Sequence, residues 1–596
     1  MREAAAVALR TVPGLMAAHV LVMLVQAVAP IAVAWLTKTV VDGLAAGTPV
    51  AGLVSVAVAL AAAGVALAAL PHVAQYLGNQ IGRQFTAHTT DRLFLATLRF
   101  SGLRRFEDPD FHDRLRMAQA SLSSGQAVLT GVLGTLRDGI TLLGMIGSLL
   151  VVSPALTAIV LATGLPILVA QLRLSRRRVS VLWEVSPTER RQMFYGDLLV
   201  TVEAAKEIRL FNSGRFLRGR MMSELRAANA AHRGMDLKAL SVEGSLTLLT
   251  AVVAGGGLVW AVTAAAAGTL TVGDVSLLVA AVAAVQSSLN GMIGSVAALH
   301  EDLLMFGHYV AVIRAEPDLP IPADPAPMPR LRHGIQLTDV WFRYSDEHPW
   351  ILRGLTLFVP AGADVAIVGL NGAGKSTLIK LLCRFYDPQR GSITWDGIDI
   401  RSVDPQELRS RISGVFQDHM DYDMSARDNV SIGFTAARDD LERVHDAAAA
   451  AGVGQTLAAL PQGYDTLLSR MFFGEDQSDP ATGVVLSGGQ WQRTALARAL
   501  FRGQRDLMIL DEPSSGLDPE AEADVHARTR RQRNGCTSVL ISHRLNTVRD
   551  ADLIVVLDGG VITEAGRHET LMASGGSYAR LFRLQASGYQ EPELVS

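Results

Sequence analysis

A glycine-rich stretch of nine residues sets the strongest constraint on how this chain folds. It runs from Gly369 to Thr377, reads GLNGAGKST, and fits the pattern G-x-x-x-x-G-K-[ST]. The apolar, largely β-branched run at 364–368 predicts a buried strand before it, and the run at 378–385 predicts a helix after it. Strand, loop and helix are the context in which this pattern binds phosphate.

The residue types of that loop indicate its chemistry. Glycines let backbone N–H groups close around phosphate oxygens, and the helix N-terminus adds a positive dipole end. We expect Lys375 to reach the terminal phosphates of a bound nucleotide and the Ser376 hydroxyl to bind Mg²⁺. A turn that only caps a helix is the alternative, but every fixed position of the pattern is met in context. The predicted binding residues are Gly369, Asn371, Gly372, Ala373, Gly374, Lys375, Ser376 and Thr377.

Apolar runs dominate the first half of the chain. Six of them are long enough, or nearly so, to cross a bilayer, which takes about 20 residues. They lie at Leu15–Leu36, Val50–Leu70, Leu136–Val152, Ala155–Leu172, Leu246–Ala267 and Val275–Leu299. A buried soluble helix is the alternative for any single run. Six such runs in one half-chain instead predict an α-helical membrane bundle.

Basic residues between the runs predict its orientation. Arginines cluster after the second run and after the fourth, whereas only Lys38 lies next to the runs on the opposite side. An excess of Lys and Arg marks the cytoplasmic side. We therefore expect a multi-pass protein of the cytoplasmic membrane, with both termini, both long loops and the second half in the cytosol.

Charge and cysteine content argue against other classes of protein. The net charge is only -3, so no overall field favours nucleic acid as a partner. Cys383 and Cys536 provide neither a disulfide framework nor the spacing of metal ligands. Within the apolar runs we expect no carboxylate at mid-run, with Arg137 and Asp138 at the inner end of the third run, within reach of the membrane interface.

The two long loops on the basic side do not have the composition of loops. Phe94–Met117 and Arg190–Arg226 show helical periodicity and few breakers, so we expect them to extend the membrane helices. Each needs a short crossing segment at its tip, and the candidates are Glu107–Leu115 and Ala204–Ser213. A solvated charged helix is the alternative for both segments.

A proline-dense run from Glu316 to Pro329 predicts the domain boundary, because proline cannot continue a helix. We expect a transmembrane domain at 1–315 with long cytoplasmic extensions, a linker at 316–330, and a nucleotide-binding domain at 331–596.

Polar residues follow several predicted strands of the second half. Gln417 follows the run 412–416, Asp511 and Glu512 end the apolar run that starts at Leu507, and His543 follows the run 539–541. Adjacent acids at the edge of a sheet suit Mg²⁺ and a water nucleophile.

Two further features have open alternatives. The glycine-rich turn Leu486–Gln490 opens a predicted helix at 491–501 and is a second anion site of the same physical type. An ordinary helix cap by Ser487 is the alternative. Tyr344 stands before the phosphate loop, where it either stacks on a base or simply ends a strand.

These motifs, in this order and spacing, resemble the ATP-binding cassette (ABC) half-transporters of the exporter type, which have six spans followed by one cassette. The most specific motif is Leu486–Gln490, the signature of that family. The resemblance covers nearly the whole chain. It implies a bundle of six transmembrane helices plus an α/β P-loop nucleotide-binding domain.

The resemblance also implies a role for each matched residue. Tyr344 would stack on adenine, and Gln417 would sense Mg²⁺ and the attacking water. Asp511 would bind Mg²⁺ together with Ser376 and Gln417. Glu512 would polarise the water, and His543 would contact the γ-phosphate.

Other matched residues imply that a complete site takes two chains. Ser487, Gly488, Gly489 and Gln490 would act on nucleotide held by the phosphate loop of a second half-transporter. The loop 515–518, which ends in Asp518, would link the two sites. The two crossing segments match the coupling helices of the family. The resemblance allows a homodimer or a heterodimer.

The function implied is that of an ATPase coupled to transport. It would export a hydrophobic or amphipathic cargo, such as a peptide, lipid or drug, by alternating access. An importer built on the exporter fold, for example for a metal chelate, a lipid flippase, and a regulatory cassette without transport are the alternatives. The continuation Gly489–Arg493 is similar to cassettes of peptide-antibiotic export systems.

The chain departs from the family pattern at two places. Gly516 replaces the usual alanine of the linking loop. The segment Arg470–Val485 before the signature is acidic, contains proline and is longer than usual.

Overall fold

The computed structural model describes residues 11–122, 124–469, 484–513, 519–533 and 535–587. The chain divides into two compact units. The first comprises 1–97 and 110–315, and the second comprises 98–109 and 316–596. The segment 98–109, predicted to belong to the first domain, therefore groups with the second unit. The predicted segment Arg470–Val485 and the predicted loop 515–518 lie almost entirely outside the described residues.

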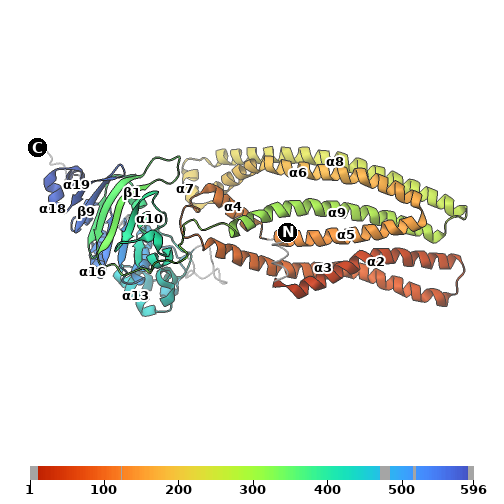
Figure 1. Cartoon of the computed structure of the whole chain (residues 1–596), viewed down its shortest axis with the longest axis horizontal. Coiled ribbons are helices and arrows are strands. Elements are labelled where there is room, and N and C mark those ends of the chain that lie inside the picture. The colour runs from red at the N-terminus through yellow and green to blue at the C-terminus, as the bar shows by residue number, and fades with distance from the viewer. Residues whose placement is uncertain (1–10, 123, 470–483, 514–518, 534, 588–596) are drawn as a thin grey trace. The chain divides into compact units, whose positions relative to one another are not determined.

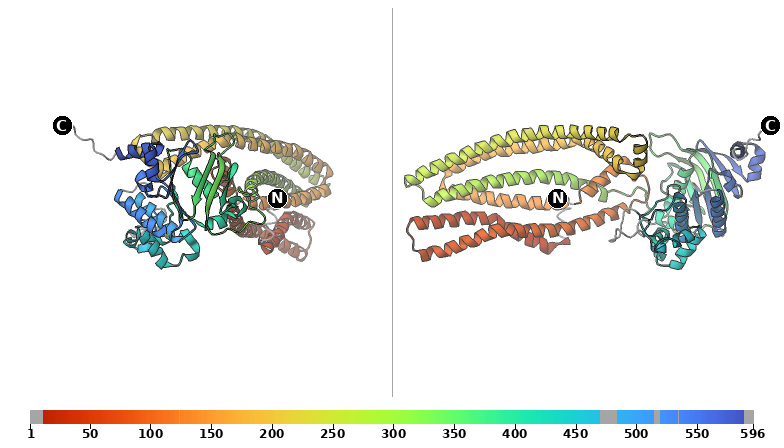
Figure 2. Two further views of the ribbon diagram at one scale, coloured as in Figure 1. Left: turned by 60° about the vertical axis from the view of Figure 1, so that its left-hand side comes forward. Right: turned by 180° about the vertical axis from the view of Figure 1, so that it is seen from behind.

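Long helices form the first unit (Figure 1). They are α2 (Pro13–Ala45), α3 (Val50–Thr97), α5 (Ser124–Val152), α6 (Pro154–Val200), α8 (Gly214–Ala266) and α9 (Val272–Ile313), with the shorter α4 (Pro109–Ala120) and α7 (Val202–Leu210) between them. Figure 1 and the two views of Figure 2 show α2 beside α3, α5 beside α9, and α6 beside α8.

Five of these helices, α2, α3, α5, α8 and α9, contain a window that is long and apolar enough to cross a membrane. The fourth predicted run lies in α6, many of whose side chains are outside the described set. Helix α3 has 48 residues and α8 has 53, more than twice the roughly 20 that a bilayer requires. The prediction that the membrane helices extend beyond the apolar runs is confirmed.

The predicted helical extension over Phe94–Met117 is interrupted between α3 and α4. Helix α3 ends at Thr97, turns and bends occupy most of 98–107, and α4 starts at Pro109. Gly102 favours the break, and a proline in the first turn of a helix needs no N–H partner there. Short helices nevertheless occur at both predicted crossing segments, because α4 overlaps Glu107–Leu115 and α7 overlaps Ala204–Ser213.

Asp138 is a buried carboxylate of α5. It lies in the middle of α5, which starts before the predicted run, and only 7% of its surface is exposed. Its reach to the membrane interface stays a prediction. Arg137 donates from Nε and Nη2 to its Oδ1 at 2.9 and 2.7 Å, while Oδ2 has no hydrogen-bond partner among the described residues. A Cβ at Gly291 of α9 would lie 2.4 Å from that Oδ2. The glycine therefore makes room for a carboxylate buried between two helices.

One ion-pair cluster joins α2 to α9. Lys38 of α2 donates to Asp42 of the same helix at 2.9 Å and to Asp274 of α9 at 2.6 Å. Asp274 also completes the capping box of α9, since its side chain accepts from the N–H of Thr271. Lys38 thus ties the first turn of α9 to α2.

Two sheets form the second unit. The antiparallel sheet has the order β2-β1-β4-β5, and the larger one has the order β10-β9-β3-β8-β7-β6. Their strands are β1 (Gly334–Phe342), β2 (Leu352–Pro360), β3 (Asp364–Val368), β4 (Arg390–Trp395), β5 (Ile398–Asp399), β6 (Ile412–Val415), β7 (Leu507–Asp511), β8 (Thr537–Ile541), β9 (Leu553–Asp558) and β10 (Val561–Gly566). All neighbours in the larger sheet are parallel except β9 and β10.

Helices cover the larger sheet. Those that bear on the site are α10 (Lys375–Leu382) and α15 (Gly488–Phe501), and the others are α11 (Pro405–Ser410), α12 (Ala426–Ser431), α13 (Leu441–Ala450), α14 (Gly454–Ala458), α16 (Pro519–Arg533), α17 (Leu545–Val548), α18 (His568–Ser574) and α19 (Ser577–Ser587). Val365 and Ile367 of β3 face the core shared with the antiparallel sheet, whereas Ala366 and Val368 face the core under α13 and α15. Burial on both faces explains why the strand reads as one apolar run.

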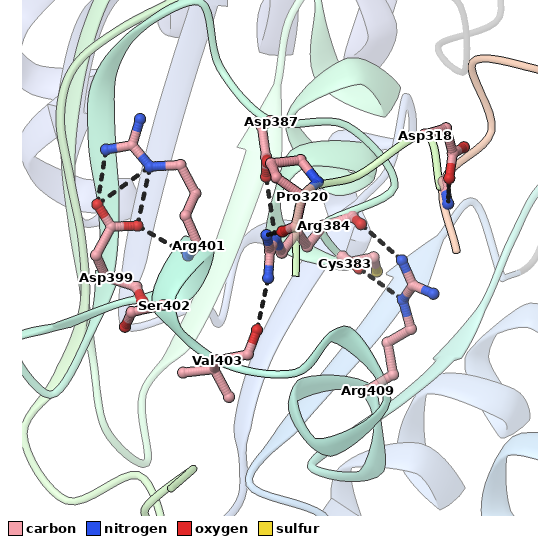
Figure 3. Close-up of polar contacts among 11 residues, drawn as sticks. Asp318, Pro320, Cys383, Arg384, Asp387, Asp399, Arg401, Ser402, Val403 and Arg409 are labelled. Atoms are coloured by element: carbon pink, nitrogen blue, oxygen red, sulfur yellow. Dashed lines mark hydrogen bonds and ion pairs between the residues drawn. The ribbon is translucent and has the colours of Figure 1, made fainter. Parts of the chain in front are cut away.

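The proline-rich run is fixed to the second unit by a buried arginine (Figure 3). Arg384, which is fully buried just after α10, donates to the carbonyl oxygens of Pro320 at 2.8 Å and Val403 at 2.6 Å. Its Nε donates to Asp387 at 3.1 Å. The start of the predicted linker is therefore part of the second unit's own structure.

The segment 98–109 is held at the same end of α10. Asp318 accepts a hydrogen bond from the N–H of Gly102 at 3.0 Å, and Leu103 donates its N–H to Phe385 at 3.1 Å. Glu107 binds Lys380 of α10 at 2.7 Å and also accepts from the hydroxyl of Tyr386. Burial, followed by this carboxylate, raises the pKa of Tyr386, so its phenol remains a donor.

Candidate nucleotide-binding site

The carboxyl ends of β3, β6, β7 and β8 lie at one edge of the larger sheet, since these strands are parallel. A cavity of about 420 Å³ opens at this edge. It is lined by Ile351, Asn371, Gly372, Gly374, Lys375, Ser376, Thr377, Gln417, Asp511, Glu512 and Ile541. The fold thus brings together the phosphate loop, the predicted glutamine and both predicted acids.

The backbone of the phosphate loop requires glycine at its ends. Gly369 has φ of 156°, and a Cβ there would lie 2.2 Å from the carbonyl oxygen of Leu557. Gly374 has φ of 101°, and its Cβ would lie 2.8 Å from Leu352. Gly374 is also the residue immediately before α10, so the loop leads straight into a helix N-terminus. That arrangement directs backbone N–H groups toward an anion.

Lys375 is buried at the mouth of this loop. Its Nζ donates to the carbonyl oxygens of Gly369 at 2.9 Å and Leu370 at 3.0 Å. Burial lowers the pKa of the ammonium, while Glu512 and Asp511 oppose that change. The cation therefore has only neutral carbonyl partners within hydrogen-bond distance among the described residues, and a phosphate is a stronger acceptor for it.

Asp511 ends β7 with 5% of its surface exposed. Burial and then the neighbouring Glu512 raise its pKa to about 6, while a hydrogen bond with the Ser376 side chain lowers it. Its Oδ1 is buried without a hydrogen-bond partner among the described residues. A hydroxyl beside an unsatisfied carboxylate oxygen is the type of oxygen donor set that Mg²⁺ takes, so the residues present fit this ion.

Glu512 has an unusual backbone conformation. Its φ is +51°, in the left-handed region that few non-glycine residues adopt. The N–H donates to the carbonyl of Ile541 at 2.9 Å, and the carbonyl accepts from Nε2 of Gln492 at 2.9 Å. Its Oε1 lies 3.2 Å from Nδ1 of His543. Two elements thus fix the backbone, and the carboxylate meets the predicted histidine.

Tyr344 lies next to this group without lining the cavity. Its hydroxyl is 3.2 Å from that of Thr377, and its ring packs edge-on against Phe342 and Tyr386. The predicted stacking on adenine stays a prediction.

The signature residues also lie outside the cavity lining. Ser487 caps α15, where its side chain accepts from the N–H of Gln490 at 3.4 Å and its own N–H donates to Gln490 Oε1 at 2.8 Å. Gly488 and Gly489 form the first turn of the helix. The cap foreseen as the alternative reading is therefore present, and Ser487 remains exposed. Asp518 lies outside the described residues.

The contact of Gln492 was not predicted from the sequence. The run Gly489–Arg493 indicated only a similarity to peptide-antibiotic export cassettes, whereas Gln492 is 4% exposed and donates to the backbone of Glu512. Its position two residues after the signature was visible. Its partner was not, because the contact depends on how α15 packs beside the end of β7.

The family model described as "ABC transporter" matches residues 352–515. The cyclolysin secretion/processing ATP-binding protein of Bordetella pertussis is 42% identical over 266 residues, which is 45% of this chain and 35% of that protein. With several curated relatives the match spans less than half of the relative's own length. An ATP-dependent lipid A-core flippase of Methylococcus capsulatus is 30% identical over 488 residues, 80% of this chain and 76% of that protein.

This chain belongs to the ABC transporter family. A solved bacterial Atm1-family ABC exporter with ATP bound has a TM-score of 0.82, with 24% identity over 97% of this chain and 99% of that one. The likeness confirms the fold of an exporter-type ABC half-transporter, a helical membrane domain followed by an α/β nucleotide-binding domain. Its apolar helices make it a multi-pass membrane protein.

Proposed function

We propose that this ABC half-transporter uses ATP hydrolysis to export an amphipathic cargo across the cytoplasmic membrane. The observation that carries the proposal is the cavity where the phosphate loop meets Gln417, Asp511 and Glu512. A loop that binds phosphate, an acid pair and a general-base candidate are the parts that hydrolysis of a nucleoside triphosphate requires.

Different residues of this chain bind the phosphates, hold Mg²⁺ and activate the attacking water. Lys375 exchanges its loop carbonyls for terminal phosphate oxygens. Ser376, Asp511 and Gln417 hold Mg²⁺, which neutralises charge on the phosphates when it is bound. Glu512 orients and polarises the attacking water, with His543 at 3.2 Å from its carboxylate available for the γ-phosphate.

A second half-transporter completes each site. Ser487 and Gly489 are at an exposed helix N-terminus outside this chain's own cavity lining, which is the position needed to meet nucleotide held by a partner. Asp518 belongs to the loop that would link the sites. Either a second copy or a related chain supports this arrangement.

The nature of the cargo is supported by the relatives. One is named a lipid A-core flippase and another a cyclolysin secretion protein, so lipids and peptides are the two classes to test. Moving a two-state equilibrium from 1:99 to 99:1 takes about 5.5 kcal/mol of differential binding. Nucleotide held between two donor-rich surfaces supplies such a difference when it joins the cassettes. The cargo pathway between the membrane helices then opens to the outside.

Glu512→Gln tests the assignment. The variant keeps the shape of the side chain but loses the general base, so we expect turnover to fall about 10²- to 10⁴-fold while ATP binding persists. Phosphate release and light scattering of the detergent-solubilised protein measure turnover and ATP-dependent dimerisation. Lys375→Ala is the control, since it weakens ATP binding itself. Near-normal turnover of Glu512→Gln would contradict the proposal.

Reconstituted vesicles test cargo and direction. Stimulation of ATPase activity by a lipid or a peptide, with ATP-dependent movement away from the cassette side, supports export. Movement toward the cassette side supports an importer, and ATPase activity indifferent to every lipid, peptide and drug tested would count against coupled transport.

A further inference from the structure

Gln492 connects the signature turn of this chain to the backbone of Glu512. The side chain lies in the second turn of α15, buried to all but 4% of its surface, and donates Nε2–H to the Glu512 carbonyl at 2.9 Å. Its Oε1 is buried and makes no hydrogen bond to a described residue. The buried amide therefore makes this one bond at the cost of an unsatisfied acceptor.

The hydrogen bond from Gln492 stabilises an unfavourable backbone conformation at Glu512. Glu512 has φ of +51°, a conformation that costs free energy for a non-glycine residue and persists only where the surroundings impose it. On one side the N–H of Glu512 is held by Ile541 of β8. Gln492 holds the carbonyl on the other side, so the direction of the carboxylate depends on both.

The signature turn and Gln492 belong to one continuous helix, α15. Ser487 caps the helix with both bonds of a capping box, and the N–H of Trp491 donates to the Ser487 carbonyl at 2.9 Å. Trp491 and Ala495 are buried in the core beside β7. Gln492 follows Trp491 directly, so a shift of the turn moves Gln492 with it.

We propose that Gln492 is a positioning residue through which nucleotide bound at the signature turn of a chain prepares Glu512 of the same chain. The inference rests on the proposed function, because that nucleotide is held by the partner's phosphate loop. Nucleotide bound at one site then changes the orientation of the Glu512 carboxylate at the other site. This link runs inside one cassette, through a single side-chain amide.

Gln492→Met tests the proposal in the full-length protein in lipid nanodiscs. Methionine has a similar shape, fills the buried space and removes the unsatisfied Oε1 together with the donor. We expect kcat for ATP hydrolysis to fall roughly five- to tenfold, the effect of one hydrogen bond. We also expect KM to change less than about twofold and the Hill coefficient for ATP to fall from near 2 to near 1, since two sites set its upper limit.

Ser413→Ala is the matched control. Ser413 of β6 is 2% exposed and donates to the carbonyl of Ala499 at 2.7 Å, so it is a second buried side-chain bond between α15 and the sheet. Its loss should lower the melting temperature at least as much as Gln492→Met does, because methionine also removes an unsatisfied acceptor, but it should leave the Hill coefficient unchanged. Gln492→Asn, whose shorter amide falls short of the Glu512 carbonyl, provides a second variant if methionine impairs folding.

The outcomes separate this inference from the proposed function. Equal cooperativity in Gln492→Met, Gln492→Asn and the unaltered protein would overturn the role of Gln492, as would a Hill coefficient of 1 in the unaltered protein. If Glu512→Gln also failed to dimerise with ATP, the proposed function itself would be at fault. Loss of cooperativity in both Gln492 variants, with Ser413→Ala unaffected, supports the link.

Discussion

Asp511 and Glu512 are adjacent in the sequence, but the structure gives them different surroundings. Asp511 is the last residue of a buried strand, with a raised pKa and an unsatisfied oxygen beside Ser376. Glu512 turns into the left-handed region and meets His543. Two neighbouring carboxylates thus acquire two environments, one suited to a cation and one to a water molecule.

The raised pKa of Asp511 predicts a pH-dependent stability change in Asp511→Asn. On folding the pKa rises from 3.8 to about 6, so the ionised form is disfavoured in the folded state. That cost is fully present above pH 6 and absent below 3.8. Without nucleotide and with EDTA, we expect Asp511→Asn to raise the free energy of unfolding by roughly 3 kcal/mol at pH 7–8.

Thermal unfolding of the full-length protein between pH 4 and 8 measures that change. The gain should shrink as the pH falls from 6 toward 4, and added Mg²⁺ should reduce it at pH 8, because the ion stabilises only the carboxylate. A gain that grows on acidification would contradict the assigned environment.

At the scale of elements, α5 and α9 meet where a small residue faces a buried carboxylate. Gly291→Ala would place a Cβ 2.4 Å from Asp138 Oδ2, so either the buried carboxylate, which is paired with Arg137, or the two helices must shift. We expect a loss of about 1–3 kcal/mol, as for other overpacked sites, seen as a lower melting temperature in detergent.

Gly294→Ala in the same helix is the comparison. A Cβ there has nothing within 4 Å, and alanine favours the helix more than glycine does. We expect an unchanged or slightly raised melting temperature. Equal destabilisation by both substitutions would show that Asp138 does not set the distance between the helices.

The elements themselves were largely predictable from the sequence, because apolar runs have strong periodicity. The run Asp364–Val368 predicted β3, and long apolar segments predicted the membrane helices. Local patterns did not predict the break at Thr97, the burial of Asp138 or the bond from Gln492 to Glu512. The last two depend on contacts with residues far away in the sequence, Gly291 and the end of β7, and the segment after Thr97 is held by a bond to Phe385.

At the scale of the whole molecule, the segment 98–109 leaves α3 and becomes part of the second unit. Its Glu107 binds Lys380 of α10 at 2.7 Å, on the helix that follows the phosphate loop. The helix that follows the phosphate loop is therefore in direct contact with the segment 98–109, which connects α3 to α4.

Glu107→Gln tests this contact in reconstituted vesicles. We expect basal ATPase activity to stay within about twofold while its stimulation by cargo falls at least about fivefold, the lower end of typical coupling. Asp113→Asn in α4 is the control, because its pair with Arg190 at 3.2 Å is exposed and contributes little. Unchanged stimulation in Glu107→Gln would rule out this contact as the route.

The bond between Asp318 and Gly102 has a practical consequence for anyone who expresses the cassette alone. A soluble fragment that begins at residue 316 lacks Leu103, which packs against the core, and it leaves Asp318 and the Phe385 carbonyl without their partners. Adding a synthetic peptide of residues 98–109 should restore part of the lost solubility and heat resistance of such a fragment.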